Sequence, residues 1–307
     1  MRTIIERRTK AERRAERQGR RLRGSVIQPA TEKRYDLALG VFFDWLEVEG
    51  RGVPRFAAAL DAAVAECIEA LWDGGESKGL AGDLLSAVTL HIPPAKGKLP
   101  MGWRLLKAWQ RMELPAQAPP FDELAIGGLV GHLAAVQGDV AMAACLAVAF
   151  HCFLRTGEAL GLQCQHVVTD GSSGAVMLPS TKKGIRDCVS ITDAAVAQLA
   201  LLRVQQAAPG DSFVGCSAAL ARTKLERALG QLGLGGVGFR WYSCRRGGAT
   251  CAFRSHGQME KVLVRGPWES GRTARIYLTD GIGQLVHLRL AEATKQKLLR
   301  LARAWVF

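Results

Sequence analysis

The chain has 307 residues, of which 48% are hydrophobic, enough for about two domains with buried cores. Its 41 Lys and Arg residues against 28 Asp and Glu residues give a formal net charge of +13. This balance predicts a polyanionic partner, either nucleic acid or an anionic membrane surface. No apolar run reaches the ~18 residues typical of a membrane span, so we expect no membrane partner.

The sequence predicts an intracellular protein. Its start has no apolar segment of the signal-peptide type, and acidic residues there disfavour a transit peptide. The eight cysteines include no C-x-x-C pair, as expected for reduced thiols. We expect the nucleus if the source is eukaryotic, and the cytoplasm or nucleoid if it is bacterial or phage. Packing or local hydrogen bonding is expected, rather than metal binding, for four residues whose spacing fits no structural zinc site: His151, Cys152, Cys164 and His166.

Residues 1–24 form a strongly basic arm. They contain ten basic and three acidic positions, a net +7, with few apolar residues. Such a segment cannot bury itself, so we expect a flexible arm or a single exposed helix. Two interpretations stay open: a solvated tail or expression remnant, or a phosphate-binding arm or nuclear import signal. The phosphate-binding interpretation assigns DNA contacts to Arg20, Arg21 and Arg23.

The apolar spacing over residues 25–115 predicts an all-helical first domain. Apolar residues recur at helical spacing after Thr31, a predicted N-cap, and this helix should stop at Gly50. Further helices are predicted between glycine and proline breaks, at 56–71, 80–91 and 103–112. Consecutive prolines cannot continue a helix, so residues 116–120 predict an extended linker.

The second half predicts a mixed domain over residues 121–284. Short β-branched runs broken by Gly and Ser predict a small antiparallel sheet at 166–169, 175–178 and 187–191. Helices are predicted at 121–136, 140–154, 193–206, 218–232, 243–255 and 259–264. An amphipathic helix is predicted over 285–307. The fold class is therefore mainly α with a small antiparallel β-sheet (α+β), in two domains.

Three segments of the second half carry candidate chemistry. In the first, Arg155 stands where an apolar helix ends at a glycine, with Glu158 able to brace it. The second is the stretch Y-S-C-R-R-G-G, which contains Arg245. The third places Trp268 nine residues before Tyr277. Taken singly, each segment is also compatible with a salt bridge or with packing.

Taken in order, these segments resemble the catalytic domain of the tyrosine recombinase (phage integrase) family. That family carries an arginine in an L-R-x-G-E context, a lysine on a β-hairpin and an H-x-x-R box. A His or Trp lies nine residues before its nucleophilic tyrosine. The helical first half resembles the family's core-binding domain in layout. The resemblance implies catalytic roles for Arg155, Lys182, Tyr242, Arg245, Trp268 and Tyr277.

Two positions depart from the family pattern or leave a choice. Tyr242 stands where the family has histidine, and a phenol is a poor proton acceptor near neutral pH. Lys183 lies beside Lys182, so the identity of the active lysine stays open, although the family register favours Lys182. Glu158 and Lys183 are assigned supporting roles.

The resemblance implies a site-specific recombinase or integrase, of a mobile element, that cuts and rejoins duplex DNA through a 3′-phosphotyrosine at Tyr277. It implies no metal or other cofactor, because Arg155 and Arg245 supply the positive charge. The partners would be double-stranded DNA and further copies of the chain, in a dimer or tetramer. The helix at 285–307 would either dock on a neighbouring copy or pack within its own chain. Further DNA contacts are expected at Lys33, Arg34, Arg246 and Arg272.

Three other functions stay open. One is a DNA-binding relative that has lost activity, for which the Tyr242 departure is the only support. Another is a type IB topoisomerase, which shares the nucleophile chemistry but relaxes supercoils as a monomer. The last is a helical RNA-binding or scaffold protein, which leaves the ordered motifs unexplained.

Overall fold

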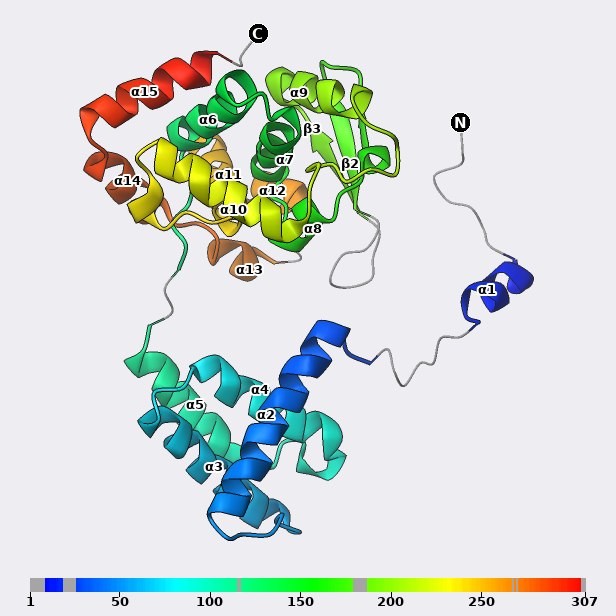
Figure 1. The fold of residues 1–307 in the computed structure, drawn as a ribbon, viewed down its shortest axis with the longest axis vertical. Coiled ribbons are helices and arrows are strands. Elements are labelled where there is room, and N and C mark those ends of the chain that lie inside the picture. Colours follow the sequence, from blue (N-terminus) through cyan, green and yellow to red (C-terminus); the bar gives the residue numbers. More distant parts are fainter. Residues whose placement is uncertain are drawn as a thin grey trace. The chain divides into compact units, whose positions relative to one another are not determined.

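The computed structural model describes residues 9–18, 26–114, 117–178, 187–266, 268 and 270–304. These residues are mainly helical with one three-stranded antiparallel sheet (Figure 1), which confirms the predicted fold class. The chain divides into two compact units, residues 1–116 and 117–307. No helix in the described part is both long and apolar enough to cross a membrane.

The first unit packs four helices around an apolar core. They are α2 (Pro29–Val48), α3 (Ala57–Asp73), α4 (Lys78–His91) and α5 (Pro100–Met112), preceded by a short helix α1 (Lys10–Glu16). Phe42, Ile68 and Leu84 are buried at the centre. The N-cap of α2 is Gln28, so the prediction for Thr31 was wrong. The helix starts earlier because a proline fits the first helical turn, where its missing N–H costs nothing.

Helix α5 begins at Pro100, three residues before the predicted start, because α3 caps it. The buried carboxylate of Asp61 accepts hydrogen bonds from the backbone N–H groups of Met101 and Gly102, each at 3.0 Å. These are first-turn donors without a partner inside their own helix. Gly102 also permits close packing, since a Cβ there would lie 2.7 Å from Leu85 Cδ2.

The second unit is built around α7 (Val140–His151), whose residues from Met142 to Ala149 are all buried. Strands β1 (Val167–Thr169), β2 (Gly174–Leu178) and β3 (Asp187–Ile191) follow in the order β1-β2-β3. Val176 pairs with Val167 on one side and Val189 on the other, and all three are buried. The other helices of this unit are α6 (Glu123–Gly131), α8 (Thr156–Leu160), α9 (Ala194–Gln205), α10 (Ala218–Gln231), α11 (Tyr242–His256), α12 (Met259–Arg265), α13 (Gly271–Arg275), α14 (Asp280–Arg289) and α15 (Glu292–Arg303).

Two adjacent glycines bring α11 into backbone contact with its neighbours. A Cβ on Gly247 would lie 2.2 Å from the carbonyl oxygen of Phe121, just before α6. A Cβ on Gly248 would lie 2.0 Å from the carbonyl oxygen of Phe150 in α7. Any side chain at either position would therefore push α11 away, and with it the residues at the start of this helix.

The C-terminal segment differs from the single helix predicted over 285–307. Two helices, α14 and α15, are separated at Leu290 and Ala291. Helix α15 lies beside α6 of the same chain (Figure 1), where Leu298 is fully buried against Gly128. Of the two placements expected for this segment, the structure has α15 packed within its own chain.

Candidate active site

The turn between α7 and α8 contains a backbone conformation that residues other than glycine rarely adopt. Phe153 has a φ of 51°, the one positive value for a non-glycine residue among the described residues. Its carbonyl oxygen accepts a hydrogen bond from the guanidinium of Arg245 in α11. Two residues later, Arg155 is the N-cap of α8. The unusual turn thus fixes Arg155 and Arg245 with respect to one another.

Arg155 is braced by Glu158, three residues along the chain. Its Nη1 donates to Glu158 Oε1 at 2.6 Å, and its backbone N–H donates to Glu158 Oε2 at 2.7 Å. The Glu158 side chain is only 8% exposed, whereas that of Arg155 is 33% exposed. The carboxylate therefore orients the guanidinium and leaves other N–H groups of Arg155 without an acceptor among the described residues, where a ligand can bind.

Arg245 is fully buried and surrounded by aromatic rings. Its guanidinium carbon lies 4.3 Å from the centroid of the Trp268 ring and 4.9 Å from that of Tyr277. A second hydrogen bond runs to the carbonyl oxygen of Gly266, at 3.3 Å. Gly266 also makes room for the indole, because a Cβ there would lie 1.7 Å from Trp268 Cζ3.

The two guanidinium groups repel one another. Burial, and next the charge of Arg155, lower the pKa of Arg245 from its usual value. No carboxylate in the described part of the chain bonds directly to Arg245. Glu158 pairs with Arg155, so two cations stand against one carboxylate, and the remaining positive charge is costly to bury without a further anion. The site is therefore suited to binding an anion.

The two tyrosines of the site face one another. Tyr277 follows α13 and is half-buried; its ring lies 5.1 Å from Trp268 and 5.8 Å from Tyr242. Burial by itself would raise the pKa of Tyr277, but the hydrogen bond with Tyr242 and the charges of Arg245 and Arg155 outweigh it and lower this pKa. Burial and the hydrogen bond to Tyr277 raise the pKa of Tyr242 to about 12.

Three buried N–H groups at and beneath this site lack an acceptor among the described residues. Nε1 of Trp268 and Nε of Arg245 lie beside Tyr277, and Nε of Arg246 lies beneath Tyr242. Leaving a buried donor unpaired costs about 1–3 kcal/mol, so such groups are rare and mark either a strained position or the place of a ligand. A ligand with several anionic oxygens could satisfy the two donors beside Tyr277 and offset the remaining positive charge of the arginines.

No family model matches this sequence, and no curated protein matches it. Solved structures do match its fold. The XerH site-specific recombinase, bound to its difH substrate in a pre-cleavage complex, is 14% identical over 83% of this chain and 78% of that one, with a TM-score of 0.54. A lambda integrase dimer bound to a core site is 13% identical over 88% and 94%, with a TM-score of 0.56. The Tn1549 transposon integrase, in complex with a circular intermediate DNA, is 11% identical over 90% and 98%, with a TM-score of 0.57.

The chain has the tyrosine recombinase fold. At these identities the likeness concerns the fold, and the site stands on its own geometry. Within this fold the structure gathers six of the residues predicted for the site: Arg155, Glu158, Tyr242, Arg245, Trp268 and Tyr277. Five further predicted residues lie outside the described part of the chain: Lys182, Lys183, Arg20, Arg21 and Arg23.

The remaining predicted DNA contacts occupy different environments. Arg246 is buried, donates to the carbonyl oxygen of Ala118 at 3.4 Å and lies 5.6 Å from the centroid of the Tyr242 ring. The DNA contact expected for Arg246 stays a prediction, and in the free protein its side chain points inward beneath Tyr242. Arg34 is exposed but paired with Asp83, with Nε 2.8 Å from Oδ2. The remaining two, Lys33 and Arg272, are exposed.

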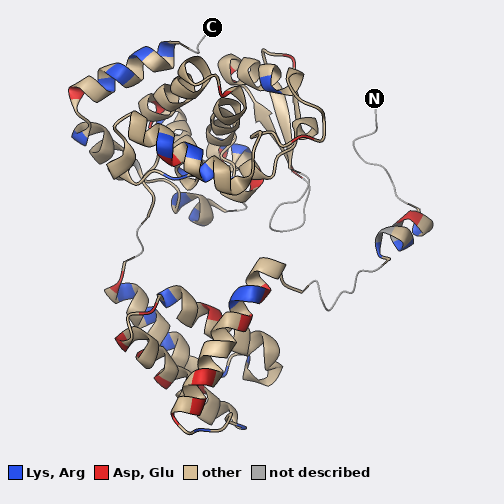
Figure 2. Ribbon diagram, viewed as in Figure 1, with Lys and Arg blue, Asp and Glu red and all other residues tan. Residues whose placement is uncertain are grey.

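Sequence reasoning missed two arginines of this tyrosine recombinase fold. Arg222 in α10 and Arg240, just before α11, line a depression of about 610 Å³ that reaches Tyr242 and Thr156. Figure 2 shows basic residues along α10 and α13. The position of Arg240, two residues before Tyr242, was a signal available in the sequence. Arg222 is brought there only by the fold.

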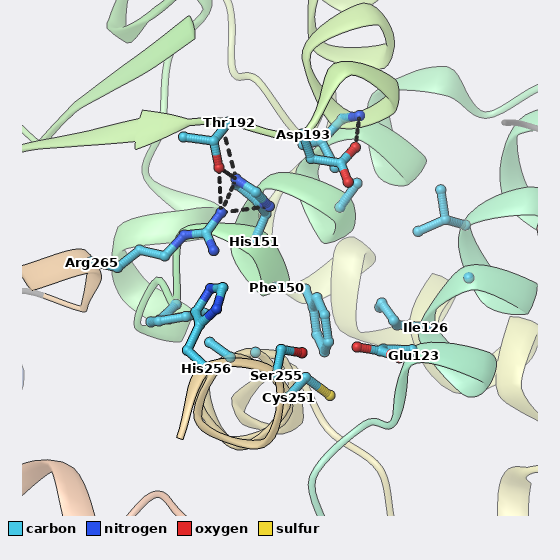
Figure 3. A pocket seen from close by; sticks show the side chains of 17 residues that line it. Glu123, Ile126, Phe150, His151, Thr192, Asp193, Cys251, Ser255, His256 and Arg265 are labelled. Carbon is cyan, nitrogen blue, oxygen red and sulfur yellow. Dashed lines mark hydrogen bonds between the residues drawn. The ribbon is translucent and has the colours of Figure 1, made fainter. Parts of the chain in front are cut away.

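A separate cavity of about 460 Å³ lies between α6, α7 and α11 (Figure 3). Arg265 hydrogen-bonds His151 and, at 2.9 Å, Oγ1 of Thr192 at one side of this cavity. Burial and next the charge of Arg265 lower the pKa of His151 to about 4. Neither Arg155 nor Tyr277 lines the cavity, so it is distinct from the candidate active site.

The four His and Cys residues with metal-like spacing do not form a cluster. Besides the bonds of His151, Cys152 Sγ lies 3.9 Å from the carbonyl oxygen of Ser190. His166 Nδ1 accepts a hydrogen bond from the backbone of Gln163 at 3.1 Å. Within the described residues, no group of three His, Cys, Asp or Glu side chains could hold a metal ion.

Proposed function

We propose that this protein is a site-specific DNA recombinase or integrase that cuts and rejoins duplex DNA through a 3′-phosphotyrosine at Tyr277. One observation carries the proposal: Tyr277 lies against Arg245, near Arg155 and beside the unpaired indole N–H of Trp268. A phosphodiester has the charge and the oxygen acceptors that these groups lack. The DNA complexes of XerH, lambda integrase and Tn1549 integrase support DNA as the ligand.

Each group has a defined task in this proposal. The Tyr277 oxygen attacks phosphorus, the bond to the 5′ oxygen breaks, and negative charge builds on the non-bridging oxygens. Arg155, Arg245 and the Trp268 indole donate hydrogen bonds to those oxygens, each worth a few kcal/mol in the transition state. We assign the proton for the leaving 5′ oxygen to Lys182 on the family resemblance alone. The phosphotyrosine conserves the bond energy for rejoining.

The proposal extends to partners and setting. Double-stranded DNA is the substrate, and pairs of sites require several copies of the chain, in a dimer or tetramer. The lambda integrase structure is a dimer on its core site, which supports such an assembly. Strand exchange of this kind fits a mobile element. The two guanidinium groups supply the positive charge that a metal ion would otherwise bring, so we propose a reaction without a cofactor.

A nicked suicide substrate tests the proposal. Duplexes from the native flanking DNA should trap an SDS-resistant protein–DNA adduct, which Tyr277→Phe abolishes. The matched control is Tyr35→Phe, since Tyr35 lies in α2 of the other unit and should leave the adduct unchanged.

The products of the same assay separate the remaining candidates. A joint product from two duplexes supports a recombinase. Relaxation of plasmid by a monomer indicates a topoisomerase instead. Tight binding without an adduct indicates an inactive DNA-binding relative, the second candidate, which is favoured only by tyrosine at position 242.

A further inference from the structure

Thr250 is a buried polar residue of α11 whose hydroxyl group bonds outside its own helix. The residue is only 4% exposed. A threonine in a helix commonly returns its hydroxyl to the carbonyl oxygen four residues earlier, as Thr89 does to Leu85 at 2.8 Å. The Thr250 hydroxyl instead donates to the carbonyl oxygen of Tyr277 and accepts from the backbone N–H of Thr279, each at 3.3 Å. One side chain of α11 thus bridges two backbone groups of the segment that carries the candidate nucleophile.

The bridged segment is the turn between α13 and α14. Its backbone continues directly from both helices: the N–H of Tyr277 donates to the carbonyl oxygen of Ala274 at 2.9 Å, and Thr279 is the N-cap of α14. Helix α13 has only five residues and α14 only ten. Helices this short are marginal on their own, so the position of the turn depends on contacts with the rest of the unit. The Thr250 hydroxyl supplies such a contact at Tyr277 itself.

Helix α11 therefore carries two groups that act on different sides of the site. Arg245, which the proposed function assigns to the phosphate, lies five residues before Thr250 on this helix. Its guanidinium carbon is 4.9 Å from the centroid of the Tyr277 ring. The glycines at 247 and 248 fix α11 by close backbone contact with its neighbours. One rigid helix thus positions both the anion-binding guanidinium and the backbone of the tyrosine.

We propose that Thr250 is a positioning residue, which holds the backbone of Tyr277 so that its phenol oxygen stays within reach of a phosphate bound to Arg245 of the same chain. Its effect on cleavage rests on the function proposed above. The hold itself belongs to the free protein and can be tested without DNA. Because the Thr250 hydroxyl is buried and engaged in two hydrogen bonds, it acts through the Tyr277 backbone and needs no contact with DNA. A misplacement of about 1 Å can slow a reaction about a hundredfold.

Three substitutions separate the hydroxyl of Thr250 from its methyl group. Thr250→Val keeps the shape and loses the hydroxyl, Thr250→Ser keeps the hydroxyl and loses the methyl, and Thr250→Ala loses both. Adduct formation on the suicide substrate, at saturating DNA, should slow about ten- to a hundredfold in the valine and alanine variants and stay near the wild-type rate in the serine variant. The Kd for DNA should be the same in all four proteins. The serine and alanine variants differ only in the hydroxyl, so they decide the outcome if Thr250→Val does not fold.

Amide hydrogen exchange tests the hold in the free protein. The Thr279 N–H should be protected in the wild type and in Thr250→Ser, and it should exchange faster in Thr250→Val and Thr250→Ala, because its acceptor is removed. The amides of α7 should keep the same protection in all four proteins, which excludes a general loosening of the unit. Thr89→Val is the matched control. Its hydroxyl bonds within α4 of the other unit, so the adduct rate and the Thr279 exchange should equal those of the wild type.

The outcomes distinguish this inference from the proposed function. Rates that follow the methyl group, with valine equal to the wild type and serine as slow as alanine, make Thr250 a packing residue and overturn the inference. Equal Thr279 exchange in all four proteins overturns it as well, and so does a rate loss that comes entirely from weaker DNA binding. If the wild type forms no adduct, the proposed function fails, and the exchange of Thr279 alone decides whether Thr250 holds the turn.

Discussion

At the scale of single residues, Arg155 depends on one carboxylate for its orientation. Glu158 accepts hydrogen bonds from both the side chain and the backbone of Arg155, and its own side chain is almost buried. Glu158→Ala should therefore slow adduct formation by roughly 10- to 100-fold, because the guanidinium loses its fixed position. The same change should lower the free energy of unfolding by about 1–3 kcal/mol, measured by urea denaturation.

Glu158→Gln is the matched variant for this prediction. It keeps an acceptor for one of the two hydrogen bonds, so cleavage should fall less than in Glu158→Ala. If both variants cleave DNA at the wild-type rate, Glu158 does not position Arg155. The DNA affinity of each variant, measured at the same salt concentration, separates a binding defect from a catalytic one.

The residues of the site were predictable from their spacing in the sequence, but the contacts that hold them in place were not. Arg155, Arg245, Trp268 and Tyr277 stand in recognisable order and come together in the structure. The positive φ of Phe153, which aims its carbonyl oxygen at Arg245, has no signature in a phenylalanine. The inward direction of Arg246 was equally hidden, because adjacent arginines on a helix look alike in sequence although they point to different sides.

At the scale of elements, the position of α11 depends on two glycines. Gly248→Ala should destabilise the protein by about 1–3 kcal/mol or more, because the new Cβ would meet the backbone oxygen of Phe150, which cannot rotate away. Thermal unfolding measures the effect. Gly281→Ala is the control: Gly281 lies in α14 with no atom within 4 Å of its Cβ position, so alanine should stabilise the helix by about 0.5–1 kcal/mol. Equal stabilities of the two variants would contradict the close packing of α11.

Helices and strands were predictable where the sequence pattern is local. The prediction of their bounds failed where a residue far away in the chain determines where a helix begins or ends. The three strands follow from β-branched runs between turn residues, and they pair as a simple meander. The start of α5 moved because Asp61, forty residues earlier, caps its first turn. The C-terminal segment forms two helices, and the second packs on α6 through Leu298 against Gly128. No periodicity in the segment itself shows that contact.

At the scale of the whole molecule, positive charge is distributed unevenly along the chain. More than half of the excess of +13 comes from residues 1–24. The second unit has exposed arginines of its own: Arg272 lies in α13, five residues before Tyr277 in the chain, and Arg222 and Arg240 line the depression that reaches Tyr242. If the arm binds phosphates, it contributes affinity without sequence preference, whereas in the proposed function the arginines of the site position one phosphate for attack.

Salt dependence of DNA binding decides whether the arm takes part. The equilibrium constant for a duplex should fall linearly with salt on a log–log plot, and the slope should flatten by about 0.9 for each phosphate that the protein no longer neutralises. Replacing Arg20, Arg21 and Arg23 with alanine should therefore flatten the slope by up to about 2.7. Arg51→Ala also removes a positive charge, but that guanidinium is already paired with Glu66, so the slope should stay as in the wild type. A triple variant with an unchanged slope would show that Arg20, Arg21 and Arg23 neutralise no phosphate and would contradict their assignment as DNA contacts.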